Sequence, residues 1–180
     1  MQTLRGQLLI AGSGLVDPNF RRAIVLIGHH DQDGAVGVIL NRPTETRVRE
    51  AVPPLGPLVG PEDRLFIGGP VQTDAAVILA EFEGSDDPEI MAFGRVGFLT
   101  GDVDVSSAQG LGRVRIFAGY AGWGPGQLEA EMEEDAWILE PAGAEDVFAD
   151  DPEGLWARIL RRKGGDFALM ATMPVDPSTN

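Results

Sequence analysis

The chain has 180 residues, and its 28 Asp and Glu residues against 14 Lys and Arg give a formal net charge of −14. With 43% hydrophobic residues, the composition is typical of one ordinary globular domain, so we expect residues 1–180 to form a single domain. Because the chain has no cysteine, disulfides, thiolate metal sites and catalytic thiols are excluded.

Segments rich in Val, Ile and Leu lie between turn signals and predict strands. In chain order they are Gln7–Ala11, Ala23–His29, Ala35–Asn41, Leu65–Gly68, Ala75–Phe82, Arg113–Ala118 and Ala136–Glu140. Asp33-Gly34 between the second and third segments supplies the positive backbone angle of a tight turn and predicts a β-hairpin. Both hairpin strands are apolar on both faces, so we expect them to be central and covered on both sides.

Helices are predicted at fewer places, namely Thr46–Val52, Gln127–Asp135 and Pro152–Lys163, with a turn at Val103–Gln109. We expect a loop at Pro53–Pro57, where N–H donors are scarce, and a frayed tail at Pro174–Asn180. Since strands and helices do not alternate regularly, the pattern favours an α+β fold with a largely antiparallel sheet.

The apolar runs and the N-terminal segment bear on membrane association and cellular location. Ala75–Ala80 covers about a third of the roughly 20 residues that cross a bilayer. The N-terminal segment, with Arg5 and the short apolar run Leu8–Ala11, lacks the pattern of a secretion signal. We therefore expect a cytoplasmic protein with no membrane partner.

Nucleic-acid binding is disfavoured by the negative charge, since such binding draws most of its affinity from Lys and Arg. The local exception is a basic cluster made of Arg158, Arg161, Arg162 and Lys163. Asp151 is placed to cap the helix that carries them, and Gly164 to end it. The cluster then completes a last helical turn, where cations offset the helix dipole, and DNA binding is the alternative.

The segment Gly119–Gly126 holds four glycines and leads from a strand into a helix. A phosphate loop needs Lys followed by Ser or Thr at the helix start, whereas this chain has Gln127 and Leu128, so nucleotide binding is excluded. Two interpretations stay open. The glycines either let Tyr120 and Trp123 pack against neighbouring backbone, or they shape a pocket for a small ligand or a partner.

The two histidines, His29 and His30, are adjacent at a strand end, so their side chains are expected on opposite faces. His30 with Asp31 and Asp33 has the residue types of a divalent-cation site or a hydrolase centre. The same Asp residues are those that a turn requires. We assign no metal site and no cofactor.

Two further groups of polar residues are candidates. Glu129 and Glu133 lie four residues apart on a predicted helix, but Leu128 and Met132 take its inner face, so the acids are expected in solvent. Arg42 follows an apolar strand and is expected either to bind a carboxylate ligand or partner, or to pair with an internal acid.

Several of these segments resemble, in order, the motifs of the AlgH/YqgE family of bacterial proteins. They are Asp17–Arg22, His30–Gly34, Gly37–Thr44, Gly68–Val71 and Gly119–Glu131, and the resemblance runs from Gly6 to about Leu160. It implies one α+β domain whose sheet folds into a pseudo-barrel with flanking helices, and an activity that is uncharacterised. Some members carry the label of transcriptional regulator. Many relatives have Cys at the position of Gly28, so no thiol role carries over.

The residues carried over as a shared surface for a ligand or partner are His30, Asn41, Arg42, Gly68, Gly69, Tyr120 and Trp123. No catalytic residue is assigned. Our leading hypothesis is a non-catalytic binding or regulatory protein with a pocket near Arg42 and Trp123 and an unknown protein or small molecule as partner. The alternative is a hydrolase that uses His30 with Asp31 or Asp33, with or without a metal ion.

Overall fold

The Val-, Ile- and Leu-rich segments are strands, and they join other strands in one ten-stranded sheet. The computed structural model describes residues 2–12, 15, 17–83, 90–100 and 110–172. The strands are β1 (Gln7–Ala11), β2 (Ile24–Asp31), β3 (Gly34–Ile39), β4 (Pro43–Arg47), β5 (Arg64–Ile67), β6 (Val71–Phe82), β7 (Ile90–Phe93), β8 (Val96–Thr100), β9 (Leu111–Trp123) and β10 (Trp137–Pro141).

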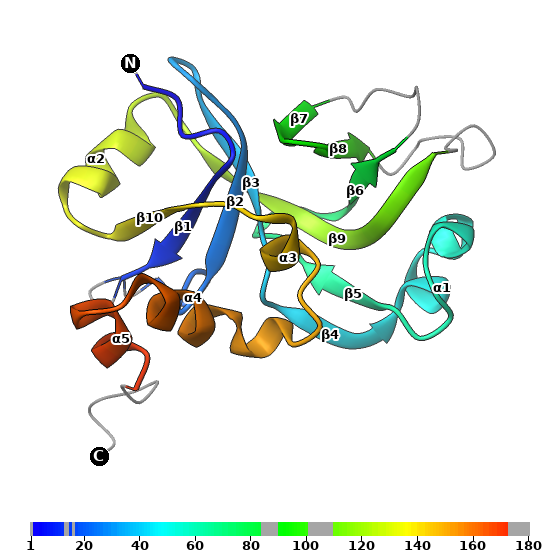
Figure 1. Cartoon of the computed structure of the whole chain (residues 1–180). Coiled ribbons are helices and arrows are strands. Elements are labelled where there is room, and N and C mark those ends of the chain that lie inside the picture. The colour runs from blue at the N-terminus through cyan, green and yellow to red at the C-terminus, as the bar shows by residue number, and fades with distance from the viewer. Residues whose placement is uncertain (1, 13–14, 16, 84–89, 101–109, 173–180) are drawn as a thin grey trace.

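The helices are short and lie around the sheet (Figure 1). They are α1 (Val48–Ala51), α2 (Gln127–Glu133), α3 (Ala144–Val147), α4 (Leu155–Lys163) and α5 (Asp166–Met170), with 3₁₀ turns at Pro53–Leu58 and Pro152–Gly154. The stretch we expected to be an irregular loop, Pro53–Pro57, is therefore a 3₁₀ turn. Each Pro fixes φ near the helical value, and such a turn needs few N–H donors. The turn expected at Val103–Gln109 and the tail expected at Pro174–Asn180 lie outside the described residues.

The order of the sheet is β10-β1-β2-β3-β9-β6-β8-β7, and β5 joins β4 to β9. The pairs along this order are antiparallel, and the β5–β9 pair is parallel. The α+β class with a largely antiparallel sheet is thus confirmed. Since β10 and β7 stand at the two ends of the order, the sheet is curled and open, and the expected pseudo-barrel is only a loose description.

Strand β9 connects the two halves of the molecule. Its Ala121–Trp123 end pairs with β3, whereas its longer first part pairs with β6. Figure 1 shows β9 running from the β6–β8 side toward the hairpin of β2 and β3. Residues far apart in sequence therefore meet along this one strand.

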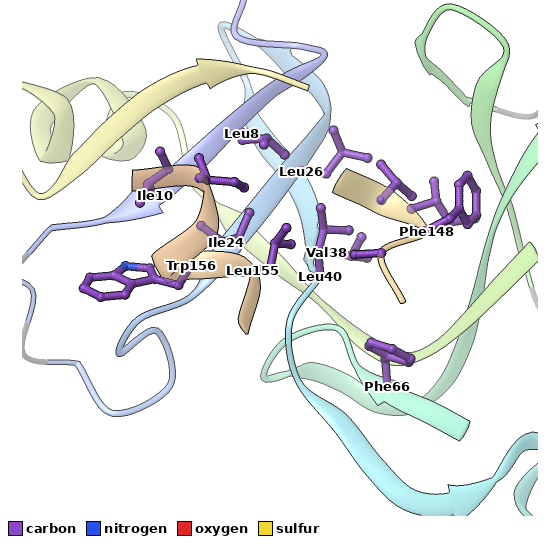
Figure 2. Close-up of a cluster of buried hydrophobic side chains, with 14 of the residues drawn as sticks. Leu8, Ile10, Ile24, Leu26, Val38, Leu40, Phe66, Phe148, Leu155 and Trp156 are labelled. Carbon is purple, nitrogen blue, oxygen red and sulfur yellow. The ribbon is translucent and has the colours of Figure 1, made fainter. Parts of the chain in front are cut away.

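The β2–β3 hairpin is covered on both faces, as predicted. On one face Ile24, Leu26 and Val38 pack with the α4 residues Leu155 and Trp156 (Figure 2). On the other face β2 and β3 contribute Val25, Ile27 and Ile39 to a second buried cluster that includes α2 and two tryptophans. Fully burying an aliphatic side chain contributes about 1.5–3 kcal/mol, so this double cover fixes the hairpin rigidly between the layers.

The 3₁₀ turn Pro152–Gly154 and helix α4 together span the range Pro152–Lys163 that the sequence predicts as helix. The Asp151 side chain accepts a hydrogen bond from the Gly154 N–H, and Gly164 ends α4 with φ of +79°. The exposed faces of the helix carry the basic cluster, while its apolar face contacts the sheet. This part of the fold follows from capping and 3.6-residue periodicity alone.

Candidate functional site

A large bulge in β6 forms one wall of a pocket. Val71 pairs with Tyr120 and Ala76 pairs with Ala118, so the four residues 72–75 stand opposite Gly119 alone. Gly119 has φ of +73°, and a Cβ atom there would lie 2.6 Å from the carbonyl oxygen of Gly69. Only glycine fits such crowded left-handed backbone, and its presence lets the β6 segment bend out of the ladder.

The pocket has a volume of about 620 Å³ and lies between the β2–β3 hairpin and strands β6, β7 and β8. This volume is in the range of small-molecule sites, about 300–1,000 Å³. Most of its described lining is apolar, and it consists of Gly28, Val36, Gly37, Val38, Val52, Ala75, Ala76, Val77, Ile90, Phe98 and Leu99. The polar residues of the lining are His29, Gln72, Asp74 and Tyr120.

His29 belongs to the pocket because β2 has a register shift between Ile27 and His29. Without that shift His29 would share the inner face of Val25 and Ile27. Its Nε2 lies 2.8 Å from Oδ2 of Asp31, and its side chain is 53% exposed. The hydrogen bond from His29, followed by the one from the Asp33 N–H, holds the pKa of Asp31 below its ordinary value.

His30 points to the opposite face, which confirms the prediction that the two histidines diverge. Its side chain is 1% exposed. Nδ1 accepts a hydrogen bond of 2.9 Å from the Leu4 N–H, so Nε2 carries the proton that is donated over 2.6 Å to Glu129. The Glu129 side chain is 41% exposed, in line with the expected outer position, but its carboxylate is also the partner of this buried histidine. His30 joins the N-terminal segment, β2 and α2, and its polar atoms are used within the fold.

Asn41 and Arg42 hold the segment that precedes β2. The Asn41 side chain accepts from the Ile24 N–H and donates to the Arg22 carbonyl, each at 2.8–2.9 Å. The Arg42 guanidinium donates to the carbonyls of Asn19 and Arg21, and burial lowers its pKa. Arg42 therefore contacts neither a carboxylate partner nor the pocket lining in the described residues; its hydrogen bonds go to backbone.

Gly68 and Gly69 allow the turn before β6 to touch β9. A Cβ atom on Gly68 would lie 2.3 Å from the Gly119 carbonyl oxygen, and one on Gly69 would lie 2.2 Å from the carbonyl group of Tyr120. Both contacts are far shorter than any side chain tolerates. Tyr120 lies on the facing strand. Of the seven residues predicted to form a shared surface, Tyr120 is the one among the described pocket-lining residues.

Trp123 is 6% exposed and belongs to an aromatic cluster with Phe20 and Trp137. Oε1 of Glu131 accepts hydrogen bonds from the indole N–H groups of both tryptophans, at 3.0 and 2.8 Å. The segment from Gly119 to Trp123, which we expected to be loop, is the end of β9. Its packing of an aromatic ring against neighbouring elements matches the first of the two interpretations of the glycine-rich segment.

The seven residues therefore do not converge on one surface. Trp123 and His30 face α2, Asn41 and Arg42 hold the chain before β2, and Tyr120 faces the pocket. Their role in binding remains a prediction. The pocket residues Val36, Gln72, Asp74 and Phe98 were missed by sequence reasoning. A signal was available in the polar run Gln72-Thr73-Asp74, which interrupts a strand pattern and is typical of a bulge.

The hydrolase alternative required His30 beside Asp31 or Asp33, and the structure separates them. Asp31 binds His29 and the Asp33 N–H, whereas His30 binds Glu129 on the other face of the strand. Across the described ranges, His, Asp and Glu residues form no group of three or more suited to a metal ion. The histidine that does contact Asp31, and that lies at the pocket, is His29.

The basic cluster of α4 is partly used inside the fold. Arg162 forms a two-pronged pair with the buried Asp146, at 2.8 and 3.1 Å, and this bond raises the pKa of Arg162. Lys163 donates to the Leu139 carbonyl, and Arg158 to that of Asp151. These contacts agree with the helix-ending interpretation of the cluster. Within the described chain, no helix is both long and apolar enough to span a membrane.

A comparison with models of protein families identifies the family of the chain. The model of the AlgH-like family matches residues 8–168. The chain belongs to the AlgH-like family. UPF0301 proteins of Streptomyces coelicolor and Thermobifida fusca are 44% and 43% identical to it, and the alignments cover 100% and 99% of this chain and 97% and 96% of theirs.

Two solved structures share the fold of this AlgH-like chain. The crystal structure of a protein from Corynebacterium diphtheriae has a TM-score of 0.84 and 26% identity, over 96% of this chain and 94% of that one. The solution structure of the AlgH protein from Pseudomonas aeruginosa has a TM-score of 0.72 and 29% identity, over 95% and 94%. The curled antiparallel sheet is thus the fold of the family, and the expected resemblance is confirmed.

Proposed function

We propose that this AlgH-like protein is a non-catalytic binding protein that takes an apolar small molecule into the pocket between the β2–β3 hairpin and strands β6, β7 and β8. The observation that carries the proposal is a pocket of about 620 Å³ with a mainly apolar lining. An apolar ligand would remove that surface from water, which contributes roughly 25 cal/mol per Å².

The rim of the pocket supports the same assignment. Val36 and Ile90 both line it, and they are 39% and 38% exposed, which is high for large aliphatic residues of a sheet. They give a ligand apolar contacts at the mouth as well as inside. Isolated exposed aliphatic residues are common, but this pair lies at the rim of an apolar pocket, which supports the proposed site.

A binding role also fits the way reactive groups are arranged. The polar atoms of His30, Arg42 and Trp123 are engaged within the fold, so the features that the sequence suggested for chemistry serve structure. In our proposal the protein works in the cytoplasm, as expected from the sequence. Any regulatory effect would then depend on the difference between its free and ligand-bound forms.

The test uses the neutral fluorescent dye Nile red as the probe. We expect it to bind the protein with a blue-shifted emission, and Val36→Asp to weaken binding about five-fold or more, since a carboxylate in the apolar rim has to be desolvated. Ile67→Asp is the matched control. Ile67 is also a strand residue 39% exposed, but it is not among the described lining residues.

A second variant, Ala75→Phe, fills the pocket without adding charge and should also weaken dye binding. Thermal melting of each variant reports whether the fold is intact. If Nile red does not bind, or if Ile67→Asp weakens it as much as Val36→Asp does, the proposed site is wrong.

A further inference from the structure

The charges of the pocket select among apolar ligands. Asp74 is exposed and lines the pocket, while the described lining contains no Lys or Arg. A ligand with a carboxylate or phosphate group would therefore meet a carboxylate and no permanent cation. The whole chain adds to this bias, because a net charge of −14 repels anions and attracts cations.

His29 is the lining residue that can become positive, but its charge would be balanced locally. Its Nε2 lies 2.8 Å from the carboxylate of Asp31, which holds whatever positive charge the ring acquires. A protonated His29 together with Asp31 is a neutral pair. Because Asp74 and Asp31 are two carboxylates against one imidazole, the pocket mouth stays negative whether or not the imidazole is protonated.

Tyr120 supplies a second feature that a cation prefers. Tyr120 belongs to the pocket lining, and the face of an aromatic ring attracts an ammonium group within about 6 Å of its centre. Gln72 adds a carboxamide, whose oxygen accepts hydrogen bonds from an ammonium group. Three of the four polar lining residues therefore offer acceptors or π electrons.

We propose that the ligand is an amphipathic organic cation, with a hydrocarbon body in the apolar part of the pocket and an ammonium group near Asp74. This inference rests on the proposed function and gives the chemical class of its ligand. The bulge of β6 is what makes it possible, because it carries Gln72 and Asp74 out of the ladder and to the pocket.

The experiment compares three probes with the same ten-carbon chain, namely decylammonium, decanol and decanoate, below their micelle concentrations by titration calorimetry at pH 7. We expect decylammonium to bind about five-fold more tightly than decanol, as one exposed charge pair allows. We expect decanoate to bind more weakly than decanol. Raising the salt concentration should reduce the difference between the two charged probes.

Two matched variants locate the effect. Asp74→Asn should bring decylammonium to within about two-fold of decanol, since it removes the lining carboxylate and leaves the shape. Asp33→Asn changes the net charge by the same amount at an exposed turn residue outside the described lining, and should leave the preference intact.

The outcomes separate the two proposals. Binding of all three probes with decanoate as tight as decylammonium, or an equal effect of Asp33→Asn and Asp74→Asn, overturns the cation preference and leaves the apolar pocket standing. Failure of all three probes to bind overturns the pocket itself.

Discussion

Near its turn, beyond the part that α4 covers, the β2–β3 hairpin has two faces that are built from neighbouring residues but differ in character. On the α2 face, His30 and Trp123 are buried and hydrogen-bonded to Glu129 and Glu131. On the pocket face, His29 and Val36 are partly exposed beside an open volume of about 620 Å³. The α2 face buries its polar groups, whereas the pocket face leaves a volume that a ligand can occupy.

This difference shows why an unusual residue is a poor guide to a binding site. The α2 face holds the aromatic and charged residues that attract attention in the sequence, and it uses them to join elements. The pocket lining consists mainly of apolar residues such as Val36, Val77 and Phe98, which resemble those of any core. The pocket face is distinguished by the unfilled volume between the strands, and that volume can be recognised only in the three-dimensional structure.

The largest effect is expected from replacing the two histidines, one on each face, and comparing the free energies of unfolding. His30→Ala removes the acceptor of the Leu4 N–H and the donor to Glu129, and it leaves a cavity, so we expect a loss of about 2–3 kcal/mol in the free energy of unfolding. His29→Ala, at the exposed neighbour, should change it by less than about 0.5 kcal/mol.

Urea denaturation of the two variants measures both values. His30→Gln provides a check, because its amide retains one acceptor and one donor and should recover part of the loss. Equal destabilisation by His29→Ala and His30→Ala would contradict the division into a packed face and an open face.

The fold was largely predictable because its signals are local. The apolar runs predicted β2 and β3, and Asp33-Gly34 predicted their turn. Asp151 and Gly164 predicted the two ends of the helical segment Pro152–Lys163 that contains α4. Strand β4, by contrast, was missed because Pro43–Arg47 is polar, and pairing with β5 rather than propensity makes it a strand. Strands β7 and β8 were missed although their residues are mostly apolar, because both strands are short.

The site was less predictable because it depends on register. His29 lines the pocket only because of the irregularity at Gly28, and Asp74 does so only because β6 bulges around Gly119. A bulge of one or more residues changes which side chains share a face, and no periodicity in the sequence fixes its place. The contact of Glu129 with His30 likewise joins residues 99 positions apart.

A smaller effect on stability and on dye binding is expected from a substitution of Gly28, at the wall of the pocket. An ideal Cβ on Gly28 would lie 2.5 Å from the ring of Phe98, so the aromatic ring packs directly on the β2 backbone at the pocket wall. Gly28→Ala should force the ring aside and cost about 1–2 kcal/mol. It should also change Nile red affinity, because the displaced ring enters or enlarges the pocket.

A double-mutant cycle tests the cause. In a Phe98→Leu background, Gly28→Ala should cost about 1 kcal/mol less than it does alone. Gly124→Ala is the control, since its nearest atom outside the adjoining residues would be 4.0 Å from the added Cβ. A cost for Gly28→Ala that does not depend on residue 98 would show that backbone conformation, rather than contact with Phe98, requires glycine.

The smallest effect concerns the charge state of the pair at the pocket mouth. The hydrogen bond from His29, and then that from the Asp33 N–H, should hold the pKa of Asp31 below its ordinary value of 3.8. A lowered folded-state pKa means that the contact stabilises the fold above pH 3.8 and that this contribution is lost as the pH falls through the lower value.

Carboxyl NMR titration of Asp31 measures this directly. His29→Ala should raise the pKa of Asp31 toward 3.8, whereas Asp33→Asn retains the backbone N–H and should change it less. A pKa of Asp31 at or above 3.8 in the unmodified protein would mean that Asp31 does not hold His29. A protonated imidazole would then lack its fixed carboxylate partner at 2.8 Å, and the local neutralisation of His29 assumed for the cation preference would fail, leaving Asp74 alone to carry it.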